Sequence, residues 1–294
     1  MTTQLKGVIP PSTTAFDAKG DIDFAAVGKQ VDWLIGHGVG GVAVGGSTGE
    51  GHAIEAAEYR DLITAATEGA AGRAPVIAGV IADSTRDAVK RGQSVADLPI
   101  AALQVTPVHY LFRPTDEAMV EHFRTLASET GMPIIIYNVV PWTYLSPQLL
   151  VRIMAEVPAV IGVKQSAGDM KLFADLMIMA DPKSLIFSAV DALMYPSYAL
   201  GAHGSIAAIL SAAPGPSVAL WDAVAAGDHA KARGLHEKLL PLWNAMPHDY
   251  LPACVKYAQS LQGVSAGLSR APMPMPNDKD KAAIQAALKG LDLI

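Results

Sequence analysis

Eight short apolar runs, each bounded by glycine, proline or polar residues, alternate with longer amphipathic stretches along the 294-residue chain. Such runs, which lack strict apolar–polar alternation, are typical of parallel strands buried on both faces. The runs cover residues 7–10, 40–45, 74–80, 101–106, 133–138, 159–164, 184–188 and 203–208. The amphipathic stretches include residues 23–37, 55–69, 84–96, 115–130, 169–180 and 191–200. Eight strand-then-helix units predict an α/β fold that closes into a (β/α)₈ TIM barrel.

The stretch 115–130 carries clear helix signals. Thr115 is a suitable N-cap, acidic residues follow it in the first turn, and the stretch ends before Gly131. An open doubly wound sheet is the competing architecture, but no GxGxxG fingerprint follows a predicted strand. The closed barrel is therefore the favoured fold.

No low-complexity segment or linker divides the chain. We expect the barrel to occupy residues 1–226, because the last strand–helix unit ends near residue 225. Residues 227–294 are interpreted as a C-terminal region made of helices only, packed on the barrel.

Charge and composition exclude several classes of partner. The net charge is −6 and no basic stripe is present, so neither nucleic acid nor an anionic membrane surface is expected. The N-terminus has no apolar signal segment, and the most apolar long stretch, 185–213, contains Asp191 and His203. Cys254 is the one cysteine, which fits a reducing compartment. We expect a cytoplasmic globular protein.

Lys164 ends the sixth apolar run, where burial of an ammonium group would be costly. Burial lowers the pKa of an amine, and a neutral amine can attack a ketone to form an imine. The alternative is a lysine at a strand end whose side chain extends to solvent. Because barrel active sites lie at the carboxyl ends of the strands, the first interpretation predicts a catalytic amine.

The segment GGSTGE, residues 45–50, ends the second run. Its glycines allow backbone amides to converge, and the hydroxyls of Ser47 and Thr48 add donors, so the loop can bind a carboxylate. A flexible glycine-rich loop without a ligand is the alternative.

Two further polar residues follow predicted strands. Tyr137 ends the fifth run, where its phenol can relay protons or simply lie at the edge of the core. Asp191 follows the seventh run, where it can bind substrate hydroxyls or begin a helix. His109 and Tyr110 follow the fourth run, and a lone loop histidine is more often structural than a base. The histidines show no metal-ligand spacing, so we expect no metal.

Taken together, four motifs resemble those of the dihydrodipicolinate synthase/N-acetylneuraminate lyase family of Schiff-base aldolases. They are PSTTAF at 11–16, GGSTGE at 45–50, the YN pair in IIIYNVVP at 134–141, and GVKQSAGD at 162–169. The resemblance runs over most of the chain and implies a (β/α)₈ barrel with a C-terminal helical extension. It implies Lys164 and Tyr137 as catalytic residues, with no cofactor.

The resemblance also implies a homo-oligomer, usually a tetramer, in which Tyr110 is the best candidate for a tyrosine shared between subunits. We take Gly46, Ser47, Thr48, Asp191 and Ile206 as substrate-binding residues. Two departures concern the substrate. Trp142 and its neighbours stand where dihydrodipicolinate synthases carry an arginine, and only the aspartate remains of the Gly-x-Asp-Glu segment of N-acetylneuraminate lyases. Trp142 and Tyr144 suggest a more apolar or bulkier pocket for the second substrate.

The leading hypothesis is a lyase that makes or breaks a carbon–carbon bond in pyruvate or a related 2-oxo acid. The nearest alternative uses the same imine to remove water or ammonia from a deoxy sugar acid or a hydroxyproline-derived acid. A remoter alternative is a non-catalytic sensor of small acids or a scaffold.

Overall fold

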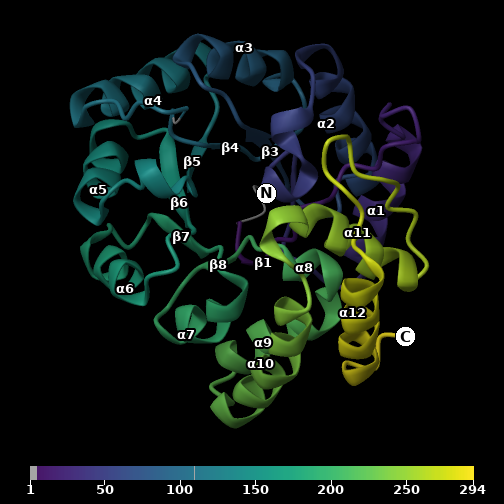
Figure 1. The fold of residues 1–294 in the computed structure, drawn as a ribbon. Helices are drawn as coiled ribbons and strands as arrows, with labels where there is room; N and C mark the ends of the chain where they lie inside the picture. Colours follow the sequence, from purple (N-terminus) through teal and green to yellow (C-terminus); the bar gives the residue numbers. More distant parts are fainter. Residues whose placement is uncertain (1–4, 109) are drawn as a thin grey trace.

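Eight parallel strands form one sheet that curves into a ring, with helices outside it (Figure 1). The computed structural model describes residues 5–108 and 110–294. The strand order around the ring is β1-β8-β7-β6-β5-β4-β3-β2, so every strand lies beside its neighbours in sequence. The strands are β1 (Gly7–Val8), β2 (Val42–Val44), β3 (Val76–Val80), β4 (Ala102–Val105), β5 (Ile134–Asn138), β6 (Val160–Gln165), β7 (Leu185–Ser188) and β8 (Gly204–Ser205). The predicted (β/α)₈ barrel is confirmed.

The ring closes between the first two strands through residues that follow β1. Pro11 forms an isolated parallel bridge with Ala43 of β2. The Ala43 N–H donates to the Pro10 carbonyl at 3.0 Å, and the Ser12 N–H donates to the Ala43 carbonyl at 2.8 Å. These bonds satisfy the backbone groups that an open sheet would leave unpaired at its edges.

Six of the barrel helices lie at the predicted amphipathic stretches, whereas those at 147–156, 209–212 and 214–225 lie outside them. The barrel helices are α1 (Phe24–Gly36), α2 (Ala56–Ala70), α3 (Thr85–Val95), α4 (Asp116–Thr130), α5 (Pro147–Glu156), α6 (Met170–Met179), α7 (Met194–Ala199), α8 (Ile209–Ala212) and α9 (Pro214–Ala225). The predicted signals of α4 are present, since Thr115 caps it by accepting from the Ala118 N–H at 3.2 Å. Gly131 ends it with a left-handed φ of +65°.

The buried apolar residues form two clusters, one inside the barrel and one between the strands and the surrounding helices. The smaller includes Ala43, Ile77, Ala102, Ile135 and Phe187, one from each of five strands. The larger contains the alternate strand residues together with the inner faces of the helices. Strand side chains alternate between two faces, so Tyr137, two positions after Ile135, also points into the barrel.

The chain after α9 forms α10 (His229–Asn244), a short η5 turn (His248–Tyr250), α11 (Leu251–Leu261) and α12 (Asp278–Gly290). The predicted C-terminal helical extension is confirmed, and residues 264–277 between α11 and α12 are not helical. Within them, Leu268 forms an antiparallel bridge with Phe16. Gly267 has a φ of +66° and prolines follow at 272, 274 and 276, all of which oppose a helix here. The division at residues 226 and 227 stays a prediction.

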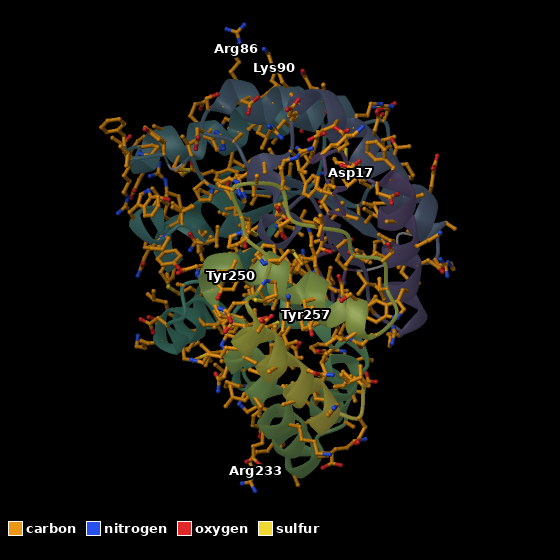
Figure 2. All side chains as sticks on the ribbon, turned by 45° about the vertical axis from the view of Figure 1, so that its right-hand side comes forward. Asp17, Arg86, Lys90, Arg233, Tyr250 and Tyr257 are labelled. Carbon is orange, nitrogen blue, oxygen red and sulfur yellow. The ribbon has the colours of Figure 1, made fainter. Side chains whose placement is uncertain are left out.

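Long charged side chains extend outward from the helices, such as Arg86 and Lys90 on α3 and Arg233 on α10 (Figure 2). Among the residues the structure describes, no helix is long and apolar enough to span a membrane.

Candidate active site

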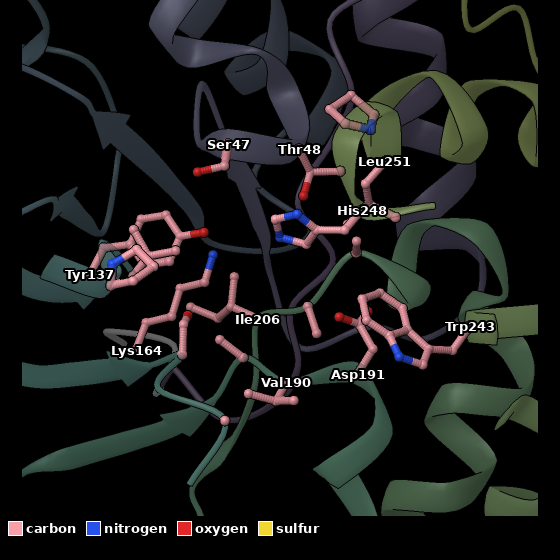
Figure 3. Close-up of a pocket in the computed structure, with 18 of the residues that line it drawn as sticks. Ser47, Thr48, Tyr137, Lys164, Val190, Asp191, Ile206, Trp243, His248 and Leu251 are labelled. Carbon is pink, nitrogen blue, oxygen red and sulfur yellow. The ribbon is translucent and has the colours of Figure 1, made fainter. Parts of the chain in front are cut away.

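A cavity of about 410 Å³ opens at the carboxyl ends of the strands, where barrel active sites lie. The barrel side includes Lys164, Tyr137, Ser47 and Thr48, and the C-terminal helices close the opposite side (Figure 3). The other lining residues are His52, Val139, Pro141, Tyr144, Ser166, Gly168, Ala189, Val190, Asp191, Ile206, Ala207, Ala208, Trp243, His248, Asp249, Leu251, Pro252 and Met273.

Strand register brings Lys164 and Tyr137 together. Tyr137 of β5 is paired with Lys164 of β6, which is paired in turn with Phe187 of β7 inside the barrel. Lys164 is only 4% exposed, and its Nζ lies 3.6 Å from the centre of the Tyr137 ring. The amine therefore lies against an aromatic face inside the barrel rather than in solvent.

Burial lowers the pKa of Lys164 to about 7, and the nearby Asp191 carboxylate opposes this change. Burial raises the pKa of Asp191 to about 6, against the Ile209 N–H and the Lys164 charge, which lower it. Near neutral pH a far larger share of the Lys164 amines is thus uncharged than for an ordinary lysine. Such an amine can act as a nucleophile.

Tyr137 is buried with its hydroxyl near the amine. Burial raises the pKa of this phenol to about 12, and hydrogen bonding to Ser47 partly opposes the rise. The phenol therefore stays protonated at neutral pH and can both donate and accept a hydrogen bond. Figure 3 shows the Lys164 amine, the Tyr137 hydroxyl and the Ser47 hydroxyl pointing into the same region.

The glycine-rich loop after β2 folds into two short turns, η1 (Ser47–Gly49) and η2 (Gly51–Ala53). Gly45 has a φ of +74°, and a Cβ on Gly51 would lie 1.9 Å from the Gly45 carbonyl oxygen. Glu50 also adopts a left-handed φ of +53° without being glycine, which costs about 1–2 kcal/mol. The loop therefore has a defined backbone conformation, in contrast to the flexible loop that was the alternative.

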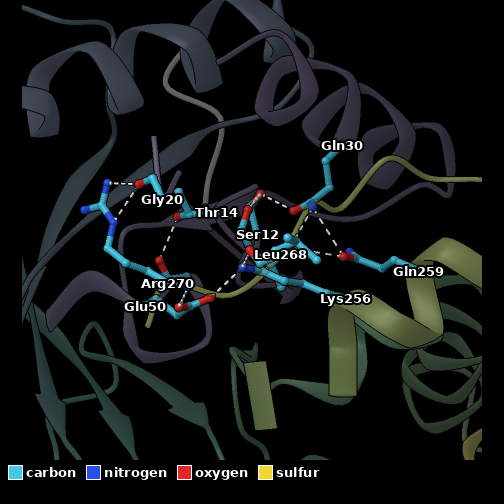
Figure 4. A network of polar contacts seen from close by, with 11 residues as sticks. Ser12, Thr14, Gly20, Gln30, Glu50, Lys256, Gln259, Leu268 and Arg270 are labelled. Atoms are coloured by element: carbon cyan, nitrogen blue, oxygen red, sulfur yellow. Dashed lines mark hydrogen bonds and ion pairs between the residues drawn. The ribbon is translucent and has the colours of Figure 1, made fainter. Parts of the chain in front are cut away.

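A buried ion pair holds this loop against the C-terminal region (Figure 4). Lys256 of α11 donates to the Glu50 carboxylate at 2.5 Å and to the Leu268 carbonyl at 2.6 Å. The other Glu50 oxygen accepts from the Arg270 N–H at 2.9 Å. The two charged side chains are 0% and 1% exposed, so their attraction is little screened by water. These contacts fix the Glu50 side chain while its backbone keeps the left-handed conformation.

Glutamine side chains make a second link between the barrel and α11. Gln30 of α1 donates to Thr13 at 2.7 Å and to the Gln259 side chain at 3.2 Å. Gln259 donates in turn to the Ser211 carbonyl at 3.1 Å. Helix α11 is thus fixed to the barrel at two places, and the residues just before it are fixed at the cavity.

Asp191 and Ile206 both line the cavity, and their predicted role in substrate binding stays a prediction. Asp191 begins the short turn η4 (Asp191–Leu193), and its Oδ1 also accepts from the Ile209 N–H at 2.5 Å, just where α8 begins. Its carboxylate therefore combines a structural contact with exposure to the cavity.

Other predicted residues lie elsewhere. Tyr110 is 61% exposed on the loop after β4 and does not line the cavity. Trp142 is 59% exposed, and its indole donates to the Tyr110 carbonyl at 2.6 Å, so only Tyr144 of the proposed aromatic pair reaches the cavity. Gly46 does not line the cavity, and its carbonyl accepts from the Gly51 N–H within the loop. His109 lies outside the described residues.

No sequence pattern marks the residues that close the far side of the cavity. His248, Asp249 and Trp243 belong to the C-terminal region, about 80 residues beyond Lys164, and Met273 follows α11. No spacing rule links them to the strand ends. His52 also lines the cavity, and the only sequence signal for it is that it closely follows the glycine-rich motif.

Within the described parts of the chain, no group of three or more histidine, cysteine or acidic side chains is arranged to hold a metal ion.

Comparisons with known proteins agree over the full chain. A model of the dihydrodipicolinate synthetase family matches residues 4–291. A 4-hydroxy-tetrahydrodipicolinate synthase from Archaeoglobus fulgidus is 31% identical, covering 98% of this chain and 99% of the relative. Two solved structures are each 25% identical with a TM-score of 0.91. One is a prophage protein of the dihydrodipicolinic acid synthase family from E. coli K12 in complex with pyruvate, covering 98% of this chain and 99% of that chain. The other is the sialic acid aldolase of Ruminococcus gnavus, with 98% of each chain covered.

Lys256→Met should destabilise the protein, because it leaves the Glu50 carboxylate buried without a partner. We expect the apparent Tm to fall by roughly 5–15 °C, from a loss of about 3–5 kcal/mol. Lys171→Met is the matched control, since Lys171 pairs with Asp175 at the surface with 77% of its side chain exposed. Differential scanning calorimetry measures both. Equal, small shifts in the two variants would show that the buried pair does not stabilise the loop.

The Lys164 amine should react as a nucleophile with a midpoint near pH 7 rather than the 10.5 of an ordinary lysine. Trace acetylation with acetic anhydride from about pH 5 to pH 10, counted by peptide mass spectrometry, measures this reactivity. Its rate should rise about tenfold per pH unit below the midpoint and then level off, because the amine is already neutral. The exposed lysines are internal controls. A Lys164 rate that still climbs steeply above about pH 8 would contradict the lowered pKa.

Proposed function

The chain belongs to the dihydrodipicolinate synthetase family, and on that premise we propose that Lys164 forms a Schiff base with pyruvate or a related 2-oxo acid. The enzyme then makes or breaks a carbon–carbon bond beta to the former carbonyl. Tyr137 carries protons, and Ser47 and Thr48 bind the substrate carboxylate together with the backbone N–H groups that open η1. Those N–H groups have no acceptor within the turn itself.

The predicted family and lyase type are confirmed, because the relatives include a synthase of this family and an aldolase. The structural relative solved with pyruvate supports a small 2-oxo acid as the substrate class here. The residue roles rest on this chain's own geometry.

The observation that carries the proposal is the buried amine. Lys164 is 4% exposed, lies over the Tyr137 ring at 3.6 Å, and has a pKa lowered to about 7 by burial. These are the conditions under which an amine attacks a ketone near neutral pH.

The chemistry follows from that amine. Its lone pair adds to the keto carbon of the 2-oxo acid, and loss of water gives a protonated imine. The Tyr137 phenol gives its proton to the departing hydroxyl, which leaves as water. The imine withdraws electrons from C3, so the resulting phenolate can accept a C3 proton and leave an enamine. Hydrogen-bond donors from the glycine-rich loop hold the carboxylate in one orientation. The imine does the work of a cofactor, so the proposal requires none.

We also propose a homo-oligomer, a tetramer by resemblance, working in the cytosol. The loop after β4 supports the first point, because Tyr110, Leu111 and Phe112 are 61%, 68% and 79% exposed. Adjacent exposed apolar residues of this kind mark surfaces that a second chain covers. Cys254 is buried and unpaired, as suits a reducing compartment.

Lys164→Ala should abolish turnover while the fold survives, because the change removes a buried amine that is costly to fold. Borohydride added with pyruvate should leave a reduced adduct on the wild-type peptide that contains Lys164, and none on the variant. Tyr137→Phe should still form the adduct but turn over roughly 10²–10⁴-fold more slowly. Peptide mass spectrometry and a coupled pyruvate assay give the two readouts.

Three outcomes would separate the alternatives. If neither pyruvate nor related 2-oxo acids leave an adduct on wild-type Lys164, the protein is better described as a sensor or scaffold. Loss of water or ammonia without carbon–carbon cleavage would indicate the elimination reaction. Near-normal turnover by Lys164→Ala would refute the assigned nucleophile.

Phe112→Asp should shift the protein toward smaller assemblies, because a charge would be buried in the contact. Light scattering after size exclusion measures the mass relative to the 30.7 kDa chain. Phe24→Asp, at the exposed start of α1, is the matched control and should keep the wild-type mass. A wild-type monomer, or an unchanged mass for Phe112→Asp, would oppose this interface.

A further inference from the structure

The cavity has two chemically different ends. At one end lie Lys164, Tyr137 and the hydroxyls of the glycine-rich loop, which the proposed function assigns to the 2-oxo acid. At the other end lie side chains from the C-terminal region, with His248 and Trp243 facing the amine across the cavity (Figure 3). A second reactant that meets the enamine at C3 must occupy this far end.

The far end offers no fixed positive charge. Among the described residues that line the cavity, Lys164 is the one lysine or arginine, whereas Asp191 and Asp249 are both acidic. Once the 2-oxo acid is bound, the positive charge of Lys164 lies on the imine and already attracts the carboxylate of that acid. A second carboxylate would thus enter a region whose remaining charges are negative.

A guanidinium beside the cavity, that of Arg270, already has partners. Arg270 borders an adjoining hollow that shares His52, Asp249 and Met273 with the cavity. Its guanidinium donates to the Glu58 carboxylate, to the Gly20 carbonyl at 2.6 Å and to the Ala53 carbonyl at 2.6 Å. The His52 and His248 imidazoles lack the two-pronged donor geometry with which arginine binds carboxylates.

Most of the far wall is apolar. It consists of Val190, Ala208, Leu251, Pro252, Met273 and the indole of Trp243. A carboxylate placed there would lose water without gaining a partner, whereas an apolar group would remove apolar surface from water. The cavity volume of about 410 Å³ is within the roughly 300–1,000 Å³ of small-molecule sites.

From these observations we propose that the second reactant is an aldehyde with an uncharged, apolar body, branched aliphatic or aromatic, which packs against Trp243 and Leu251. This inference rests on the proposed Schiff-base function and names its partner substrate. It differs from what the name of the 4-hydroxy-tetrahydrodipicolinate synthase relative indicates, since a dipicolinate carries two carboxylates.

The coupling step balances without an added reagent. C3 of the enamine attacks the aldehyde carbon and forms the new carbon–carbon bond, while the carbonyl electron pair moves to oxygen. That oxygen takes the proton that Tyr137 had accepted from C3. Water then adds to the imine carbon, and cleavage of the carbon–nitrogen bond releases a 4-hydroxy-2-oxo acid and the free Lys164 amine. Cleavage runs through the same steps in reverse.

Two aldehydes of nearly equal shape test the proposal. In 4-methylpentanal an isopropyl group stands where succinic semialdehyde has a carboxylate. Each is offered to the full-length protein with pyruvate, and product formation by liquid chromatography and mass spectrometry gives kcat/KM for the aldehyde. We expect 4-methylpentanal to be favoured by about 10²-fold, since a desolvated charge is left without a partner. Equal values, a preference for succinic semialdehyde, or no product with either aldehyde would overturn the proposal.

Two variants locate the preference at the far end. Trp243→Ala should lower kcat/KM for 4-methylpentanal by about tenfold, and Trp243→Phe should restore most of it. His248→Arg places a guanidinium at the cavity and should raise kcat/KM for succinic semialdehyde by about tenfold. Unchanged ratios in both Trp243→Ala and His248→Arg would refute the placement.

The borohydride trap with pyruvate alone separates two kinds of failure. If the Lys164 adduct forms but the aldehyde preference is absent, this inference is wrong and the proposed function stands. If no adduct forms, the proposed function fails, and the inference fails with it.

Discussion

The amine of Lys164 lies inside a closed ring of strands and forms no ion pair with any described residue, although the charge of Asp191 acts on it. A barrel imposes this arrangement, because the side chains of neighbouring strands at one level all point to the same interior. Register places Lys164 beside Tyr137 and Phe187, so a phenol and an apolar ring surround the amine instead of water. The lowered pKa is a consequence of position in the sheet, and the reactivity follows from the pKa.

A reactive amine alone does not select a substrate, and here the C-terminal region completes the site. Lys256 and Gln259 fix α11 against the glycine-rich loop and α1 through buried polar contacts. The same helix begins at Leu251, just where the chain reaches the cavity. One set of contacts therefore holds the glycine-rich loop and the far wall in fixed relation. A change in α11 is expected to affect both ends of the cavity.

Local sequence patterns are enough to predict the strands, the cap of α4 and the unusual position of Lys164. The eight apolar runs became strands because β-branched and apolar residues suit a surface buried on both sides, and the Thr115 cap of α4 obeys a short-range rule. A lysine at a strand end was conspicuous because burying it is costly. No local pattern marks Trp243 and His248, since their place at the cavity depends on how α10 and η5 pack on the barrel, far in sequence from Lys164. Tyr144 and Trp142 are near neighbours in sequence, yet the η3 turn (Pro141–Thr143) sends one into the cavity and the other to the surface.

The two stages of the proposed reaction place opposite electrostatic requirements on the surroundings of Lys164. The amine must be uncharged to attack, which favours a dry, apolar surrounding. The imine that follows is positively charged and gains from the nearby Asp191 carboxylate, whose pKa near 6 leaves it mostly ionised at neutral pH. A second anionic group would compete with the 2-oxo acid carboxylate for that single positive charge and would meet Asp191 at close range. An uncharged partner avoids both costs, so the burial that activates Lys164 also limits the charge of what can react with it.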